Sequence, residues 1–188
     1  MTNLMFNLRA AVRLRSAALG LAIMLGPISV QMILVPMTTH AAAPAPLQSF
    51  NSAGVSPRPV EDTTSASIQR DYAHAWKSLV VALEENRTEL LNENFTGTAR
   101  QQWQEAIHTQ KQNGLSRRIV DHGHSVRVTF YSLDGSALEA TDTADLEIQY
   151  REGGKVISTE RVQAHYLVLL TPAENSWKLR MLQEVPAN

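Results

Sequence analysis

The spacing of apolar residues changes once along this chain of 188 residues, from a helical repeat to an alternating one. From Tyr72 to about residue 114, apolar side chains recur every three to four positions, and from Val126 onward they recur at every second position. A helical pattern cannot serve as a strand, and the reverse also holds. The chain is therefore expected to form its helices first and its strands afterwards, as an α+β domain.

Two helices are predicted in the first part of this domain. The first begins between Ser67 and Asp71, and its apolar stripe is Tyr72, Trp76, Leu79, Val80, Leu83, Leu90 and Leu91. The second begins near Thr98, a suitable N-cap residue, and ends at Asn113-Gly114. Its stripe is Ala99, Trp103, Ala106 and Ile107. Residues 115–120 are predicted to form a short third element.

Four strands are predicted to follow, near residues 126–131, 138–150, 156–171 and 177–185, separated by turn sequences such as Asp134-Gly135. Short turns force neighbouring strands to be antiparallel. One face of the sheet is apolar and the other largely polar, so the helices are expected to cover only one face. The predicted fold is N-terminal helices packed on a curved four-stranded antiparallel sheet.

Pairing across the turn at residues 172–175 sets the predicted register of the last two strands. It places Leu170 beside Trp177, Val168 beside Leu179 and Tyr166 beside Met181, all facing the helices. On the other face it places Leu167 opposite Arg180 and His165 opposite Leu182. The apolar residues gathered on that open face are the predicted interface for a protein partner or a second copy: Leu167, Leu169 and Leu182. The alternative is a small patch shielded by residues 115–120 or by the preceding linker.

The N-terminal segment has the features of an export signal. Arg9, Arg13 and Arg15 precede an apolar run at residues 17–37, and Ala41-Ala42-Ala43 follow it. The run has about the length of a membrane-spanning helix, which favours a retained anchor. Its Gly and Pro residues weaken a continuous helix, which favours cleavage. Residues 1–43 are thus a signal peptide or signal anchor, and the domain is expected outside the cytoplasm, either periplasmic or secreted after cleavage, or anchored by a single span.

Residues 44–67 are predicted to be a disordered linker, because Pro44, Pro46, Pro57 and Pro59 lie among small polar residues. Residues 68–188 then form the folded domain. All 18 acidic residues of the chain, but only 13 of its 17 basic residues, lie from Glu61 onward. This acidic balance is a poor match for nucleic acid. The chain has no cysteine, which excludes disulfides and thiolate metal sites.

Several short segments carry a resemblance to a known family. They are Ala75-Trp76-Lys77, Trp103, residues 111–114, residues 164–168 and Trp177-Lys178-Leu179. In their order the chain resembles the nuclear transport factor 2-like (cystatin-like) superfamily from Asp71 to Pro186. Within it, the chain is similar to the IMS domain of plastid division proteins and their bacterial relatives. The resemblance implies a non-enzymatic, partner-binding module, although ketosteroid isomerases and polyketide cyclases share the fold.

Asp142 is the candidate catalytic residue, because it interrupts an otherwise apolar row on its strand. In the isomerase-like relatives, an acid inside the cone is the general base. The alternative is a bend that turns Asp142 to solvent. Five aromatic residues are candidates for a ligand pocket or simply for the core: Tyr72, Trp76, Trp103, Tyr166 and Trp177. His122 and His124 lack an evident third metal ligand, so no metal or cofactor is expected.

The sequence therefore favours an exported, non-enzymatic partner-binding or scaffold domain of the cell envelope. The alternative is a small-molecule-binding or isomerase/cyclase-type enzyme that uses the cone interior, with Asp142 as base. An interior filled by its own aromatic side chains would favour the scaffold. An open interior cavity with Asp142 pointing into it would favour the enzyme.

Overall fold

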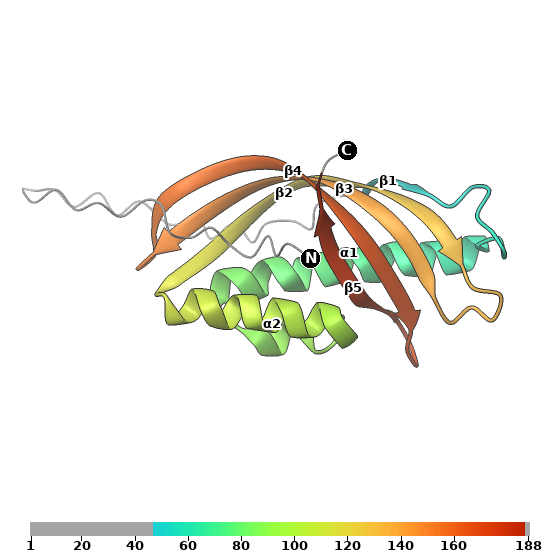
Figure 1. Cartoon of the computed structure of the whole chain (residues 1–188), viewed down its shortest axis with the longest axis horizontal. Helices are drawn as coiled ribbons and strands as arrows, with labels where there is room; N and C mark the ends of the chain where they lie inside the picture. Colours follow the sequence, from blue (N-terminus) through green and yellow to red (C-terminus); the bar gives the residue numbers. More distant parts are fainter. Residues whose placement is uncertain (1–46, 187–188) are drawn as a thin grey trace, which may run out of the picture. The chain divides into compact units, whose positions relative to one another are not determined.

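The computed structural model describes residues 47–186, and within this range the helices precede the long strands as the sequence predicts (Figure 1). A short strand β1 (Leu47–Asn51) is followed by α1 (Asp62–Glu85), a 3-10 helix η1 (Thr88–Leu91) and α2 (Gly97–Gln112). Four strands complete the chain: β2 (Leu115–Tyr131), β3 (Leu138–Glu152), β4 (Lys155–Pro172) and β5 (Trp177–Val185).

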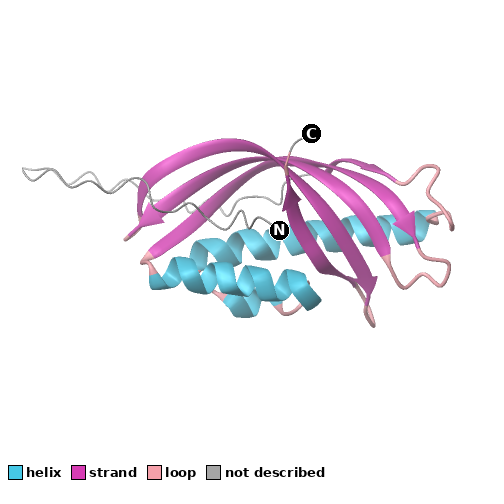
Figure 2. Cartoon of the chain, in the orientation of Figure 1, coloured by secondary structure: helices cyan, strands magenta, loops and turns pink. Residues whose placement is uncertain are grey.

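The five strands form one sheet in the order β1-β2-β3-β4-β5. The pairs β2–β3, β3–β4 and β4–β5 are antiparallel, whereas β1 pairs parallel with β2. The sheet arches over α1 and α2, which both lie on its inner side (Figure 2). The predicted α+β class is thus confirmed, but the sheet is mixed and has five strands instead of four.

The N-terminal part of the domain differs from the prediction. Within the range predicted as a disordered linker, residues 47–51 form β1 and residues 62–67 form the first turns of α1. Leu47 and Phe50 of β1 pack against the core, and Ile68 of α1 is fully buried. The predicted signal segment, residues 1–43, lies outside the described residues. Within residues 47–186, neither helix combines the length and the apolar character that a membrane span needs.

Residues 115–120 do not form a separate element, because β2 begins at Leu115 and runs without a break to Tyr131. The core between sheet and helices is built as predicted from the α1 stripe, with Tyr72, Trp76, Leu79 and Leu83 all buried. These side chains face the inner row of β3, whose members Leu138, Ala140, Asp142, Ala144 and Leu146 are buried as well.

The register of β5 differs from the prediction in two ways, so the predicted pairs Leu170–Trp177, Val168–Leu179 and Tyr166–Met181 are all wrong. Next to the turn, Trp177 pairs with Pro172, a shift of two residues that leaves Trp177 and Leu179 facing the helices. Further along, a bulge at Arg180 changes the register again. Leu169 pairs with Met181 and Leu170 with Leu179, so Arg180 is an extra residue on β5. Beyond the bulge, Leu167 lies opposite Gln183, His165 opposite Val185 and Val168 opposite Leu182. Leu182 is 3% exposed, so its predicted place on the open face is wrong. The reason is that one extra residue exchanges inward and outward positions along the rest of the strand.

The first residues of α2 and the N-cap residue before them hold this bulge in place. The Thr98 hydroxyl donates to the Arg180 carbonyl at 3.0 Å, and the Thr96 amide donates to the Leu179 carbonyl at 2.8 Å. Gly97 lies between them at φ +54°, where a Cβ atom would come within 3.0 Å of the Arg180 side chain. A glycine at this position lets the start of α2 approach β5 closely enough to make both hydrogen bonds.

Candidate functional site

Asp142 points into the space between sheet and helices. It is 1% exposed and pairs in regular register with Val126 of β2 and Tyr166 of β4. No bulge or bend turns it to solvent, so that alternative is wrong. The structure thus places a carboxylate in the interior, where its neighbours decide what it can do.

Two side chains bind the same oxygen of Asp142. The Tyr72 hydroxyl of α1 donates to Oδ2 at 2.6 Å, and the His124 Nδ1 atom of β2 lies 2.7 Å from Oδ2. The other ring nitrogen of His124, Nε2, lies 2.9 Å from Oδ2 of Asp121. The imidazole is therefore held between two carboxylates. The Oδ1 atom of Asp142 has no hydrogen-bond partner among the described residues.

A second bulge, at His122, explains how Asp121 and His124 both face inward although they are three residues apart. Residues three apart in a regular strand point to opposite faces. Here Asp121 pairs with Leu146 and Gly123 with Asp145, so His122 is the extra residue and the alternation is reset.

Gly123 permits this bulge. It adopts φ +135°, and a Cβ atom there would overlap the side chain of Gln48. The Gln48 amide of β1 donates to the His122 carbonyl at 2.8 Å, and the Gly123 amide donates to Oδ1 of Asp121 at 2.9 Å. Strand β1 therefore supports the geometry of the buried residues, and it requires a glycine beside it.

The charge of His124 follows from these contacts. Burial alone would lower the pKa of its imidazole, but the hydrogen bonds and charges of Asp121 and Asp142 outweigh burial and raise the pKa to about 9. The ring is thus protonated at neutral pH and donates to both carboxylates. Burial, followed by the charge of Asp142 and its hydrogen bond, raises the pKa of Tyr72 well above its usual value, so the phenol stays neutral.

The predicted pocket aromatics divide into two groups. Tyr72, Trp76 and Tyr166 come together around His124, with the Trp76 ring centroid 4.5 Å from that of His124 and 5.5 Å from that of Tyr166. The Trp76 and His124 rings are tilted by 44° to each other. Trp177 instead lies near Tyr131, with ring centroids 6.3 Å apart, and Trp103 belongs to α2. The interior around Asp142 is thus lined by close-packed aromatic rings.

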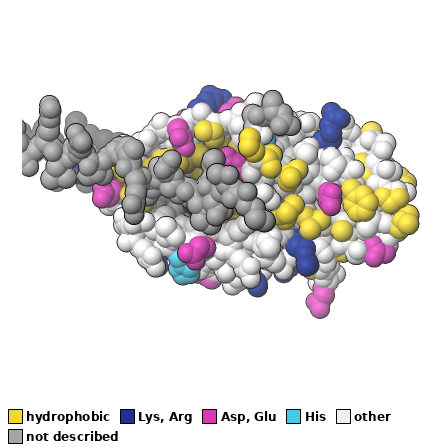
Figure 3. Space-filling view, in the orientation of Figure 1, with side chains coloured by type: hydrophobic (Ala, Val, Ile, Leu, Met, Phe, Trp, Pro, Cys, Tyr) yellow, Lys and Arg dark blue, Asp and Glu magenta, His cyan; other side chains and the backbone are white. Residues whose placement is uncertain are grey.

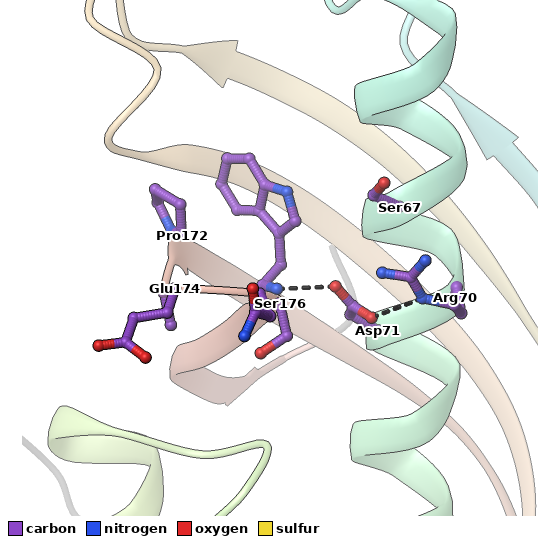
Figure 4. Close-up of a pocket in the computed structure, with 9 residues that line it drawn as sticks. Ser67, Arg70, Asp71, Pro172, Glu174 and Ser176 are labelled. Carbon is purple, nitrogen blue, oxygen red and sulfur yellow. Dashed lines mark hydrogen bonds and ion pairs between the residues drawn. The ribbon is translucent and has the colours of Figure 1, made fainter.

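A pocket of about 280 Å³ opens at the surface between α1 and the turn from β4 to β5 (Figure 4). It is lined by Ser67, Arg70, Asp71 and residues 172–177. Oδ1 of Asp71 binds the Arg70 guanidinium at 2.9 Å, and Oδ2 accepts the Trp177 amide at 2.7 Å. The carboxylate is therefore already paired on both oxygens, and its role is to fasten the β4–β5 turn to α1.

The network of Asp121, His124, Asp142 and Tyr72 is the feature that sequence reasoning missed. Asp142 was singled out, but neither His124 nor Tyr72 was predicted to bind it. A signal was present in Gly123, because an isolated glycine in a strand pattern marks a bulge. Among residues 47–186, no group of three or more His, Cys, Asp or Glu side chains has an arrangement suited to a metal ion.

The network predicts a pH dependence of stability. A histidine has its ordinary pKa of 6.5 in the unfolded chain and about 9 here, so the folded state binds the proton more tightly. The stabilisation, about 3 kcal/mol, should be complete below pH 6.5, decline as the pH rises, and be lost above about pH 9. Urea unfolding from pH 6 to pH 10 measures it. The His124→Gln variant should lack this decline. If the free energy of unfolding changes equally with pH in both proteins, a protonated His124 in the folded state is contradicted.

Comparisons with known proteins concern the fold. No family model matches the chain, and no curated protein matches its sequence. Among solved structures, the intermembrane space region of the chloroplast protein ARC6 is similar, with a TM-score of 0.58 and 18% identity over 69% of this chain and 100% of that one.

Other solved structures are more distant. A cystatin-like protein of unknown function from Nostoc punctiforme has a TM-score of 0.41 and 13% identity, covering 66% of this chain and 92% of its own. A proposed ketosteroid isomerase from Shewanella frigidimarina has a TM-score of 0.38 and 15% identity, covering 61% and 94%. At such low sequence identities, structural similarity says nothing about a shared function. The chain thus shares its fold, over that 69% of its length, with the intermembrane space region of ARC6.

Proposed function

We propose that this chain is an exported, non-enzymatic scaffold domain of the cell envelope that binds a protein partner. The observation that carries the proposal is the closed state of the interior. Tyr72, His124 and Asp142 are each no more than 3% exposed, and they are bonded to one another. A substrate that reached Asp142 would have to displace Tyr72 or His124, each of which is packed against other side chains.

The second candidate is an isomerase/cyclase-type enzyme with Asp142 as base. One observation favours it: Oδ1 of Asp142 and Nε1 of Trp76 are buried and have no hydrogen-bond partner among the described residues. Unpaired buried polar atoms are costly, and a bound small molecule would satisfy them. Against this candidate, Oδ2 of Asp142 already accepts one hydrogen bond from Tyr72 and one from a protonated His124.

The partner surface that we propose is the open face of β4 and β5, with its membership revised by the bulge at Arg180. Leu167 is 41% exposed, and Leu169 is half-buried directly opposite Met181. Met181 thus takes the place that was predicted for Leu182. We call Leu167, Leu169 and Met181 the open-face patch. Figure 3 shows apolar side chains gathered on one face of the molecule, between scattered charged residues. Because Leu133 is also exposed, the patch must be tested against another exposed apolar site.

Crosslinking of the full chain in cells, followed by pull-down from membrane and soluble envelope fractions, tests location and partner together. The double variant Leu167→Glu with Met181→Lys is expected to lose the crosslinked partner. Leu133→Glu, at a loop residue that is 72% exposed, is the matched control and should retain it. Asp142→Asn should also retain the partner if the interior is structural. The scaffold proposal fails if the chain stays in the cytoplasm or if the folded patch variant keeps every partner.

A further inference from the structure

Strand β4 has a long edge that no described strand covers. It runs from Lys155 to Pro172, but β5 pairs only with its second half, from His165 onward. The first half, residues 155–164, pairs with β3 on one side, and within residues 47–186 no strand pairs with its other side. Figure 1 shows the β3–β4 hairpin reaching past the end of β5.

The chemistry of this edge suits strand pairing. Residues 155–161 are all exposed, and Val156 and Ile157 are 49% and 56% exposed, which is high for large apolar side chains. The segment is rich in β-branched residues and contains no proline. An exposed edge of this kind is a template for another extended chain, since its main-chain groups on that side are free to pair.

The charges along the edge indicate which chain fits. Ile157 is an extra residue on β4, so Lys155 and Glu160 lie on one face of the sheet and Val156 and Thr159 on the other. An antiparallel two-fold pairing centred on Ser158 therefore sets Lys155 opposite Glu160 of a second copy, and Val156 opposite Thr159. Opposite charges directly across a strand pair are stabilising, and the two-fold axis makes this contact twice. Pairing centred on Glu160 or on Arg161 would instead place like charges opposite each other. The edge therefore complements itself in one register.

We propose that residues 155–160 of β4 pair antiparallel with the same segment of a second copy, so that two sheets continue across a two-fold axis. The bulge at Ile157 interrupts regular pairing and limits the contact to a short stretch. The association is accordingly weak and reversible, and the two-fold symmetry closes it as a dimer instead of a filament. This inference involves neither the open-face patch nor the interior, and it stands independently of the scaffold role.

The absence of cysteine from the chain allows a clean test with the full-length protein. Two differently tagged chains are co-expressed, one carrying Val156→Cys and the other Thr159→Cys, and are then oxidised. Residues directly opposite in an antiparallel pair have Cα atoms about 4.5–5.5 Å apart, which is within disulfide range. A disulfide-linked heterodimer is expected. The matched control pairs Val156→Cys with Leu133→Cys, which lies in an exposed loop away from the edge. It should give at least about tenfold less disulfide-linked heterodimer.

Charge reversal tests the register. In the same cysteine pair, Lys155→Glu alone or Glu160→Lys alone makes both cross-strand contacts repulsive and should reduce the linked dimer about tenfold. Both changes together restore opposite charges and should restore the dimer. Thermal unfolding of each variant checks that the exposed substitutions leave the domain folded. The proposal is overturned if the linked dimer does not exceed the control, or if folded charge variants show no loss and recovery.

Discussion

Replacing Asp142 with alanine is expected to lower the free energy of unfolding by about 3–5 kcal/mol. The change leaves a protonated His124 with only one of its two carboxylates, in a position that is 3% exposed. It also leaves the Tyr72 hydroxyl, which is fully enclosed, without its acceptor. Urea unfolding monitored by tryptophan fluorescence gives the loss directly.

Asp145 offers a matched control on the same strand. Its carboxylate binds the Arg161 guanidinium at 2.8 Å on the open face, where solvent screens the pair. Asp145→Ala should therefore destabilise the domain far less than Asp142→Ala. Similar losses for the two variants, or a negligible loss for Asp142→Ala, would show that the buried network contributes little. Asp142→Asn, which keeps an acceptor for Tyr72, should fall between the wild type and Asp142→Ala.

Replacing Trp177 with alanine is also expected to cost about 3–5 kcal/mol, as for other large aromatic residues removed from cores. Trp177 is 8% exposed, and its ring faces that of Tyr131 across the core. Its main-chain amide, which donates to Asp71, is retained in alanine, so the loss reports the side chain alone. Leu133→Ala at an exposed loop is the control and should change the stability little. A loss below about 1 kcal/mol for Trp177→Ala would mean that the site collapses without a cavity.

The helices and the long strands were predictable because their apolar spacing records burial on one face. Tyr72, Trp76, Leu79 and Leu83 of α1 are buried as their spacing predicts. Strand β1 was not predictable, since it has only Leu47 and Phe50 to bury and lies among prolines. Its pairing depends on β2, which is distant in sequence.

The Asp142 network and the open-face patch were each predictable only in part, because a bulge determines each of them and both bulges contact distant residues. The bulge at His122 needs the Gln48 amide of β1, and the bulge at Arg180 needs Thr98 at the start of α2. Alternation along a single strand carries no information about such contacts. Asp142 could thus be selected from its strand alone, and His124 shares the inward face of Val126 by simple alternation. Asp121 could not be placed beside them, because the bulge at His122 resets the face on which Asp121 lies.

The extra residue at Arg180 also has a consequence for sequence alignment. The pattern of inward residues in β5 changes phase within the strand, from Trp177 and Leu179 to Leu182. An alignment that places a one-residue gap in the preceding turn, where gaps are usually tolerated, would match inward positions of this chain to outward positions of a relative. A gap at position 180 instead keeps the two halves of β5 in phase with a relative that lacks the bulge.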